Sequence, residues 1–361
     1  MTFEIYNGDA RKELSRIPDE SVDCCITSPP YFGLRDYGTG MWVGGDPDCS
    51  HRNLKYVNNT CTSGKKQNSL PGNVGNGIYK TICPKCGAVR VDSQIGLEET
   101  PFAYVSSLME VFREVYRVLK PTGTLWLNLG DSYSGSGRGQ YPDGCKDTKR
   151  AKTQSMKLPK DNGILPAKNM YGIPWRVAFA LQDAGWILRQ DIIWQKPQTM
   201  PEPVKDRCVK SHEYIFLLSK EPSYYFDYKA IQEPSYYFDS DSRAGKRNPR
   251  PEGKRKNAKG MDNTPVIINE MRNKRDVWSV NTDHFEGAHF ATFPEELVKP
   301  MVLAGCPRGG VVLDPFTGSG TTGVVALMEG RNFVGCELNA DYHAMAEKRI
   351  KGAWEASPSL F

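Results

Sequence analysis

The first thirty residues alternate between apolar and polar positions in a way that predicts a strand, a helix and a second strand. Residues 3–6 have the period-two alternation of a half-buried strand, and the Asn-Gly-Asp turn at residues 7–9 leaves an acid at its end. Apolar residues at helical spacing follow, including Leu14, until Pro18 ends the helix. The continuous apolar run at residues 22–26 is typical of a strand buried on both faces. This pattern indicates a β-α-β unit.

The middle of the chain alternates regular elements with segments that lack periodicity. Residues 37–96 are rich in Gly, Asn, Ser and Lys, which indicates an insertion outside the sheet. A helix is predicted from Pro101 to a Lys-Pro-Thr-Gly end at residues 120–123, because its apolar positions follow the i, i+3, i+4, i+7 pattern. Residues 134–168 are expected to form a mobile loop near the site. Further predicted elements are strands at residues 125–129, 187–194 and 214–218 and a helix at residues 174–184.

The C-terminal part has the order strand, glycine-rich turn, helix, strand. The strands are predicted at residues 311–316 and 333–337, and the helix at residues 323–328. Only about forty residues follow the turn, too few to build a doubly wound sheet after it, so earlier strands must complete the sheet. The strand at residues 214–218 is too apolar for an edge exposed on both faces. The sequence therefore predicts an α/β fold with a doubly wound, mostly parallel, Rossmann-like sheet.

The length, the net charge and one basic stretch of the chain bear on its domain number and on its binding partner. A chain of 361 residues with net charge +5 makes one large or two medium domains. Residues 243–259 carry eight Lys or Arg against one acid, Glu252, which favours a polyanion at one face. The seven residues 221–227 recur identically as residues 233–239, a local duplication too short for a solenoid. Residues 224–283 mix aromatic and cationic side chains and are predicted to read nucleic acid, with a solvated loop as the alternative. Candidate phosphate contacts are Lys246, Arg247, Arg250, Lys254, Arg255 and Lys256.

Neither a membrane span nor a secretion signal is found, so we expect a cytoplasmic protein. Ten cysteines in such a chain argue against a disulfide framework. Four residues of the first insertion, Cys49, His51, Cys83 and Cys86, have the chemistry and spacing of a structural zinc site. Cys61 is a substitute for any of them, and a loop with scattered reduced thiols is the alternative.

The tetrapeptide Ser28-Pro29-Pro30-Tyr31 follows the second predicted strand, where open α/β sheets place their ligands. The prolines remove two amide donors and leave carbonyls free of ladder bonds. A rigid hydroxyl, a rigid carbonyl and an aromatic face suit a planar NH2 group, such as the exocyclic amine of a nucleobase. Two acceptors that favour a tetrahedral nitrogen would stabilise its attack on a methyl donor. The alternative is a proline-rich turn.

The glycine-rich turn is compatible with two cofactors. Gly318, Gly320 and Gly323 satisfy the dinucleotide fingerprint, and Glu337 stands where an acid would bind ribose hydroxyls. However, the Asp-Pro-Phe at residues 314–316 separates the strand from the first glycine. An acid there would repel a pyrophosphate but attract an ammonium or sulfonium ion. S-adenosylmethionine carries both cations and no phosphate, so it is favoured over NAD.

Both motifs resemble those of a known family. Ser-Pro-Pro-Tyr resembles the catalytic motif of the amino-methylating DNA methyltransferases of bacterial or phage type, and Asp-Pro-Phe-x-Gly-x-Gly-Thr-Thr resembles their cofactor motif. Residues 7–9 resemble the segment whose acid contacts the cofactor adenine, and residues 288–294 resemble the element that closes over its methionine part. The order of motifs is that of the β group, which implies a circularly permuted sheet. The resemblance covers nearly the whole chain outside the two inserts.

This resemblance implies roles for individual residues. It implies catalysis by Ser28, Pro29, Pro30 and Tyr31. It implies S-adenosylmethionine binding by Asp9, Phe293, Asp314, Pro315, Phe316, Gly318, Ser319, Gly320, Thr321, Thr322 and Glu337. The expected units are a catalytic domain in three parts (1–44, 97–223 and 284–361), a zinc-binding insert (45–96) and a target-recognition region (224–283).

The implied reaction is methylation of the exocyclic amine of a base extruded from double-stranded DNA. Serine in the first motif position resembles the cytosine-N4 enzymes, and adenine N6 is the alternative. Cytosine C5 methylation has no candidate Pro-Cys nucleophile here. A catalytically inactive nucleic-acid-binding module on the same fold is the more remote alternative. A cognate restriction endonuclease is a candidate partner.

Overall fold

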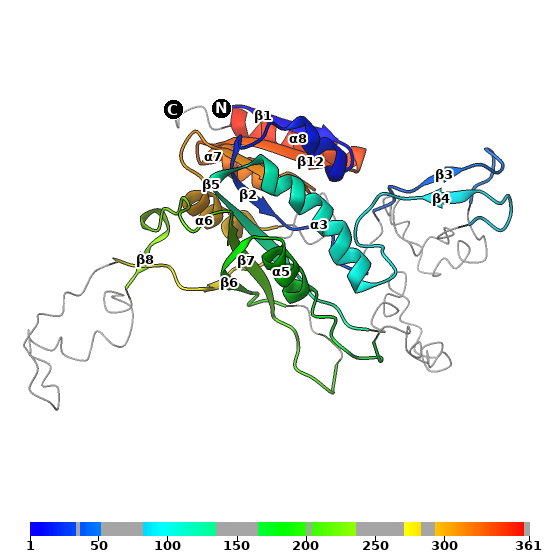
Figure 1. The fold of residues 1–361 in the computed structure, drawn as a ribbon, viewed down its shortest axis with the longest axis horizontal. Helices are drawn as coiled ribbons and strands as arrows, with labels where there is room; N and C mark the ends of the chain where they lie inside the picture. Colours follow the sequence, from blue (N-terminus) through cyan, green and yellow to red (C-terminus); the bar gives the residue numbers. More distant parts are fainter. Residues whose placement is uncertain are drawn as a thin grey trace, which may run out of the picture.

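The computed structural model describes residues 1–33, 37–51, 82–134, 165–199, 202, 204–235, 271–282 and 293–356. Its centre is an eight-stranded sheet with the order β1-β12-β11-β2-β5-β7-β6-β10 (Figure 1). The strands are β1 Phe3–Asn7, β2 Val22–Thr27, β5 Leu119–Leu129, β6 Ile187–Gln195, β7 His212–Ser219, β10 Val277–Ser279, β11 Val311–Asp314 and β12 Asn332–Glu337. All neighbours pair in parallel except β7, which is antiparallel to β5 and β6. The predicted α/β class with a mostly parallel sheet is confirmed.

Helices cover both faces of this sheet. One hydrophobic core is covered by α1 (Ala10–Glu13), α3 (Pro101–Val118) and α5 (Ile173–Asp183). Helix α1 is short and continues as the 3-10 turn η1 (Leu14–Arg16). A second core on the opposite face contains α6 (Glu295–Gly305), α7 (Thr321–Met328) and α8 (Ala340–Glu355). Because the helices form a layer on either side, β2, β11 and the centre of β5 are buried almost throughout. No helix in the described part of the chain is long and apolar enough to span a membrane.

The two motif-bearing strands are neighbours although the sequence separates them by almost the whole chain. β11 pairs in parallel with β2, with Val312 opposite Cys24 and Leu313 opposite Cys25. Parallel neighbours end at the same edge of a sheet, so the residues after β2 and those after β11 lie side by side. This adjacency brings the predicted catalytic and cofactor segments to one place.

Helix α3 ends earlier than the sequence pattern predicts. Strand β5 begins at Leu119, and residues 120–123 lie within it as an irregularity, because Val22 pairs with Leu119 whereas Cys24 pairs with Thr124. The Lys120 ammonium forms an ion pair with Asp23 of β2 at 2.7 Å. A proline and a glycine are tolerated inside the strand because the irregularity takes them out of the regular ladder.

Both described ends of the region 224–283 pack with the catalytic sheet. Strand β10 pairs with β6, and the Phe226 ring stacks on the Trp126 ring of β5 at 6.1 Å. The Tyr225 N–H donates to the Thr122 carbonyl. The short strands β8 (Glu233–Pro234) and β9 (Met271–Arg272) form a separate two-stranded ladder after the 3-10 turn η3 (Lys229–Ile231). The proposed target-recognition region thus begins and ends in contact with the central sheet.

The first insertion contains a hairpin outside the central sheet. Strands β3 (Met41–Val43) and β4 (Val89–Val91) pair with each other, Val89 also bridges Ile82, and Figure 1 shows the hairpin beyond α3 at one side of the molecule. The chain after β4 returns to the sheet, where the Ser93 carbonyl accepts a hydrogen bond from Arg11. The Gln94 side chain accepts the Tyr37 N–H at 2.7 Å. The two ends of the insertion are thus joined to each other beside α1.

Candidate active site

The carboxyl ends of β1, β12, β11, β2 and β5 meet the first residues of β7 around a cavity of about 450 Å³. The four predicted catalytic residues line it together with Asp9, Phe293, Asp314, Pro315, Phe316, Gly318, Ser319, Thr321, Thr322 and Glu337. Gly320 is not among the lining residues. Its φ is 85°, and a Cβ would lie 3.1 Å from Ala346 of α8, so glycine is needed there for a left-handed turn and close helix packing.

Asp314 ends β11 and is 3% exposed. Its carboxylate accepts hydrogen bonds from the Thr27 hydroxyl at 2.7 Å, the Thr322 hydroxyl at 2.8 Å and the Phe316 N–H at 3.0 Å. Burial raises the pKa of Asp314 to about 6, although these hydrogen bonds act in the opposite direction. Since Thr27 belongs to β2, one carboxylate connects the cofactor strand with the strand before the catalytic tetrapeptide.

Glu337 ends β12 on the same side of the cavity. It accepts the Gly318 N–H and the Asn339 N–H, each at 2.8 Å. Burial raises its pKa to about 7. The donors to both Glu337 and Asp314 are neutral hydroxyl and amide groups, so this end of the cavity has negative charge that a cationic ligand would offset.

Asp9 also lines the cavity, but it already has a charged partner. Its carboxylate forms an ion pair with the Arg11 guanidinium at 2.6 Å and caps α1 by accepting the Arg11 N–H at 3.0 Å. Arg11 in turn holds the Ser93 carbonyl of the returning insertion at 2.8 Å. Asp9 therefore has a structural role in addition to the one expected at the cofactor.

The tetrapeptide predicted to be catalytic follows β2 directly and is held by neighbouring elements. The Pro30 carbonyl accepts the Tyr104 hydroxyl of α3 at 2.9 Å. The Ser28 Oγ lies 3.1 Å and the Tyr31 Oη 2.9 Å from Oδ1 of Asn128, near the end of β5. Burial, followed by the negative charge of Glu213, raises the pKa of Tyr31 well above its ordinary value, so its hydroxyl stays protonated.

Sequence reasoning missed several polar residues of the cavity, among them Asn128, Lys196, Lys210 and Glu213. Asn128 donates from Nδ2 to the Tyr214 carbonyl at 3.0 Å, which turns its Oδ1 toward the Ser28 and Tyr31 hydroxyls. Lys196 forms an ion pair with Glu213. Two of these residues could have been noticed in the sequence. Asn128 is a polar residue within an otherwise apolar predicted strand, and Glu213 directly precedes a second predicted strand.

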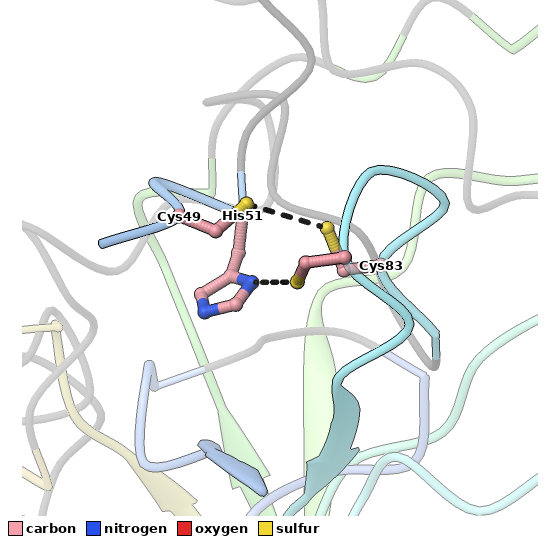
Figure 2. Close-up of side chains that lie close together, drawn as sticks. Cys49, His51 and Cys83 are labelled. Atoms are coloured by element: carbon pink, nitrogen blue, oxygen red, sulfur yellow. Dashed lines mark hydrogen bonds between the residues drawn. The ribbon is translucent and has the colours of Figure 1, made fainter. Parts of the chain in front are cut away.

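The four predicted metal ligands come together in the first insertion. One ligand atom from each of Cys49, His51, Cys83 and Cys86 lies within 4.8 Å of all the others. Figure 2 shows Cys49 and His51 facing Cys83 across the cluster; the Cys49 and Cys83 sulfurs are 3.8 Å apart, and Cys86 Sγ is 3.6 Å from His51 Nδ1. The Trp42 ring of β3 stacks on the His51 ring at 4.4 Å, which fixes its orientation.

Other predicted residues lie outside the described part of the chain. These are Cys61 and the six candidate phosphate contacts, Lys246, Arg247, Arg250, Lys254, Arg255 and Lys256. Of the segment at residues 288–294, the structure describes Phe293, which lines the cavity, and Pro294, which precedes α6.

Comparison with solved structures supports the fold. The structure resembles the PvuII DNA methyltransferase, a protein described as cytosine-N4-specific, with a TM-score of 0.55 and 17% identity over 98% of this chain and 92% of that one. It also resembles TTHA0409, a putative DNA modification methylase from Thermus thermophilus solved with S-adenosyl-L-methionine. That TM-score is 0.51, with 21% identity over 100% of this chain and 98% of that one.

Sequence comparison identifies the family. The N6/N4 family model described as DNA methylase matches residues 22–348. The Type II methyltransferase M.SmaI of Serratia marcescens is 39% identical over 96% of this chain and 90% of its own length. M.Cfr9I of Citrobacter freundii is 38% identical over 96% of this chain and 87% of its own. These matches confirm the resemblance drawn from the two motifs, and the chain belongs to the N6/N4 family of amino-methylating DNA methyltransferases.

Proposed function

We propose that this protein transfers a methyl group from S-adenosylmethionine to N4 of a cytosine extruded from double-stranded DNA. It would act in the cytoplasm as the modification enzyme of a restriction-modification system. The observation that carries this proposal is that one cavity joins an anionic end, with Asp314 and Glu337, to an end with uncharged acceptors at Ser28 and Pro29. The first end suits a cationic methyl donor and the second an amine.

At the anionic end, Asp314, Phe316, Gly318 and Glu337 would hold the cofactor. When bound, S-adenosylmethionine supplies a methyl group activated by a sulfonium cation. Among the described residues, Asp314 and Glu337 have neutral donors, so they could accept hydroxyl or ammonium hydrogens without first breaking an ion pair. A pyrophosphate would instead bring negative charge against both carboxylates, which disfavours NAD.

Cofactor affinity is expected to fall as the pH drops below about 7, because the pKa of Glu337 is near that value in the free protein. The affinity falls in this direction because a protonated Glu337 loses its charge and part of its capacity to accept hydroxyl hydrogens. One such group would raise the Kd for S-adenosylhomocysteine by at most about tenfold per pH unit below 7. Calorimetry between pH 5.5 and 8.5 measures this.

The control for this titration is Glu337→Gln, which cannot ionise. It should bind more weakly than the wild type at pH 8 and lose the steepest part of the pH dependence. A wild-type affinity that stays constant from pH 8 to pH 6 would contradict the role given to Glu337.

At the other end, the chain offers two oxygens to an amine. Asn128 Oδ1 can accept the Ser28 hydroxyl proton, which leaves the Ser28 lone pairs available to the cavity. No donor among the described residues reaches the Pro29 carbonyl, which proline geometry holds rigid. Two acceptors placed for a tetrahedral nitrogen draw its lone pair out of conjugation with the base, and so stabilise the transition state more than the ground state. A base can reach them only when extruded from the helix.

Cytosine is favoured over adenine by the donors at this end. Beside its amine, the cytosine edge carries two acceptors, N3 and O2, whereas the adenine edge has N1 and a C–H. The Lys210 ammonium lines the cavity and donates to the Asp131 carbonyl at 3.3 Å, which leaves hydrogens available for such acceptors. Lys196 is a second ammonium on the same side. The serine in the first position of the motif also favours cytosine, as does the cytosine-N4 specificity stated for the PvuII enzyme.

Nucleoside analysis tests the base. DNA incubated with the protein and cofactor, then digested to nucleosides, should contain N4-methylcytidine in its deoxy form by mass spectrometry. DNA incubated without cofactor is the control. N6-methyladenosine without N4-methylcytidine would overturn the assignment to cytosine and leave the roles of Ser28 and Pro29 intact.

We further propose that Cys49, His51, Cys83 and Cys86 hold a structural zinc ion. In a tetrahedral site with Zn–S near 2.3 Å and Zn–N near 2.0 Å, two sulfurs lie about 3.8 Å apart and a sulfur and a nitrogen about 3.5 Å apart. The separations of 3.8 Å and 3.6 Å in the cluster agree with these values. A disulfide would need sulfurs about 2.05 Å apart.

The central part of the region 224–283 is proposed to contact DNA. Lys246, Arg247, Arg250, Lys254, Arg255 and Lys256 would bind phosphates, which supplies affinity without sequence readout. Neutral variants should then bind all sequences more weakly and with a shallower salt dependence. A change in the methylated sequence would instead assign these residues to base reading.

A further inference from the structure

The hydroxyl of Tyr31 has more partners than stacking on a base requires. Its Oη lies 2.7 Å from Oε2 of Glu213 and 2.9 Å from Oδ1 of Asn128. A phenol has one proton, and the shorter contact is to a carboxylate, so we assign the donated hydrogen bond to Glu213. Stacking needs only a ring, which phenylalanine would supply. The hydroxyl must therefore have another role.

Glu213 is itself held in place by a cation. Its other carboxylate oxygen, Oε1, forms an ion pair with Lys196 Nζ. Lys196 lies 4.1 Å above the Trp194 ring, and both Lys196 and Glu213 are largely buried. Lys210 is a second cation facing Glu213, and Asp131 and Glu202 are the nearby acids. The carboxylate therefore presents Oε2 to Tyr31 from a fixed position.

The Tyr31 ring is also confined at its edge. A Cβ on Gly130, just after β5, would lie 2.5 Å from Cε2 of the ring, so the ring lies directly against backbone at that point. With its edge against Gly130 and its hydroxyl held by Glu213, the ring has a defined plane. Such a plane is available to a base before the base arrives.

We propose that Glu213, held by Lys196, is a positioning residue that fixes the plane of Tyr31 for stacking on the target base. This inference rests on the proposed methyl transfer, since the stacked base is its substrate. Glu213 acts chiefly through the Tyr31 hydroxyl at 2.7 Å, a much shorter contact than the 3.4 Å from Asn128 Nδ2 to the same carboxylate oxygen, so most of its contribution requires that hydroxyl. Strands β6 and β7 thereby control the geometry of a catalytic segment that follows β2.

A double-mutant cycle tests the dependence on Tyr31. Glu213→Ala and Tyr31→Phe should each lower kcat by about 10- to 100-fold, as expected for loss of a hydrogen bond to a charged group. Together they should lower it no further than either alone. Glu213→Gln keeps an acceptor for the hydroxyl and should retain most of the activity lost in Glu213→Ala. The Kd for S-adenosylhomocysteine should stay within about twofold of wild type in every variant.

Glu114→Gln is the matched control, because Glu114 forms a partly buried ion pair with Arg117 on α3, away from the cavity. Its kcat should equal that of wild type. Effects of Glu213→Ala and Tyr31→Phe that multiply in the double variant would overturn the inference, as would full activity of Glu213→Ala. Failure of the proposed function would look different, since wild-type protein would then transfer no methyl group to DNA.

Discussion

Replacing Ser28 with alanine is expected to lower kcat for methylation by about two to three orders of magnitude, the usual effect of removing one preorganised hydrogen-bonding group from a transition state. The Ser28 hydroxyl lines the cavity and is oriented by Asn128 at 3.1 Å. Alanine leaves the amine with the Pro29 carbonyl as its single acceptor. Because the Ser28 hydroxyl bonds to Asn128 and not to Asp314 or Glu337, the affinity for S-adenosylhomocysteine should not change. Single-turnover methylation and calorimetry measure the two quantities.

Ser21→Ala is the matched control. The Ser21 hydroxyl donates to the Pro18 carbonyl before β2 and is not among the residues that line the cavity, so this variant should be as active as wild type. A Ser28→Ala variant with kcat within twofold of wild type would contradict the acceptor role. Equal loss of kcat and of cofactor affinity would instead indicate that the β2 end had moved.

Removing the proposed zinc ion is expected to cause a large loss of folding stability in the first insertion. Purified protein should contain one equivalent of zinc by elemental analysis, and Cys83→Ser should lose it. Structural zinc sites contribute about 10–16 kcal/mol of binding free energy, which becomes folding free energy for a segment with little apolar core. Limited proteolysis should therefore cut the insertion of the variant rapidly. Cofactor affinity should also fall, because Ser93, Gln94 and Ile95 after β4 line the cavity.

Cys208→Ser is the control for this experiment. Cys208 is an exposed free cysteine outside the insertion, so its loss should change neither the zinc content nor the proteolysis pattern. Metal-free wild-type protein with unchanged stability and protease resistance would remove the zinc proposal. Zinc that persists in Cys83→Ser would point to another ligand set.

The amino-acid sequence by itself determined the elements and the two motifs. Strands β2, β11 and β12 lie within one residue or two of their predicted bounds, because runs of buried apolar residues are recorded in the local pattern. The proposed catalytic and cofactor segments could be predicted because proline, glycine and aspartate produce their chemistry within a few consecutive residues. The four proposed metal ligands could be predicted in the same way, from residue type and spacing, and their ligand atoms lie together.

Only the tertiary structure decided which distant residues meet. Sequence periodicity reports whether a position is buried but not which strand lies beside it, so it could not predict that β10 joins the edge of the sheet or that β7 is antiparallel. For the same reason, it could not connect Tyr31 with Asn128 and Glu213, which lie 97 and 182 residues away along the chain. Those contacts depend on β2, β5 and β7 being consecutive in the sheet. Strand order is a property of the whole fold, because the neighbours of each strand depend on how all the strands and their connections pack together.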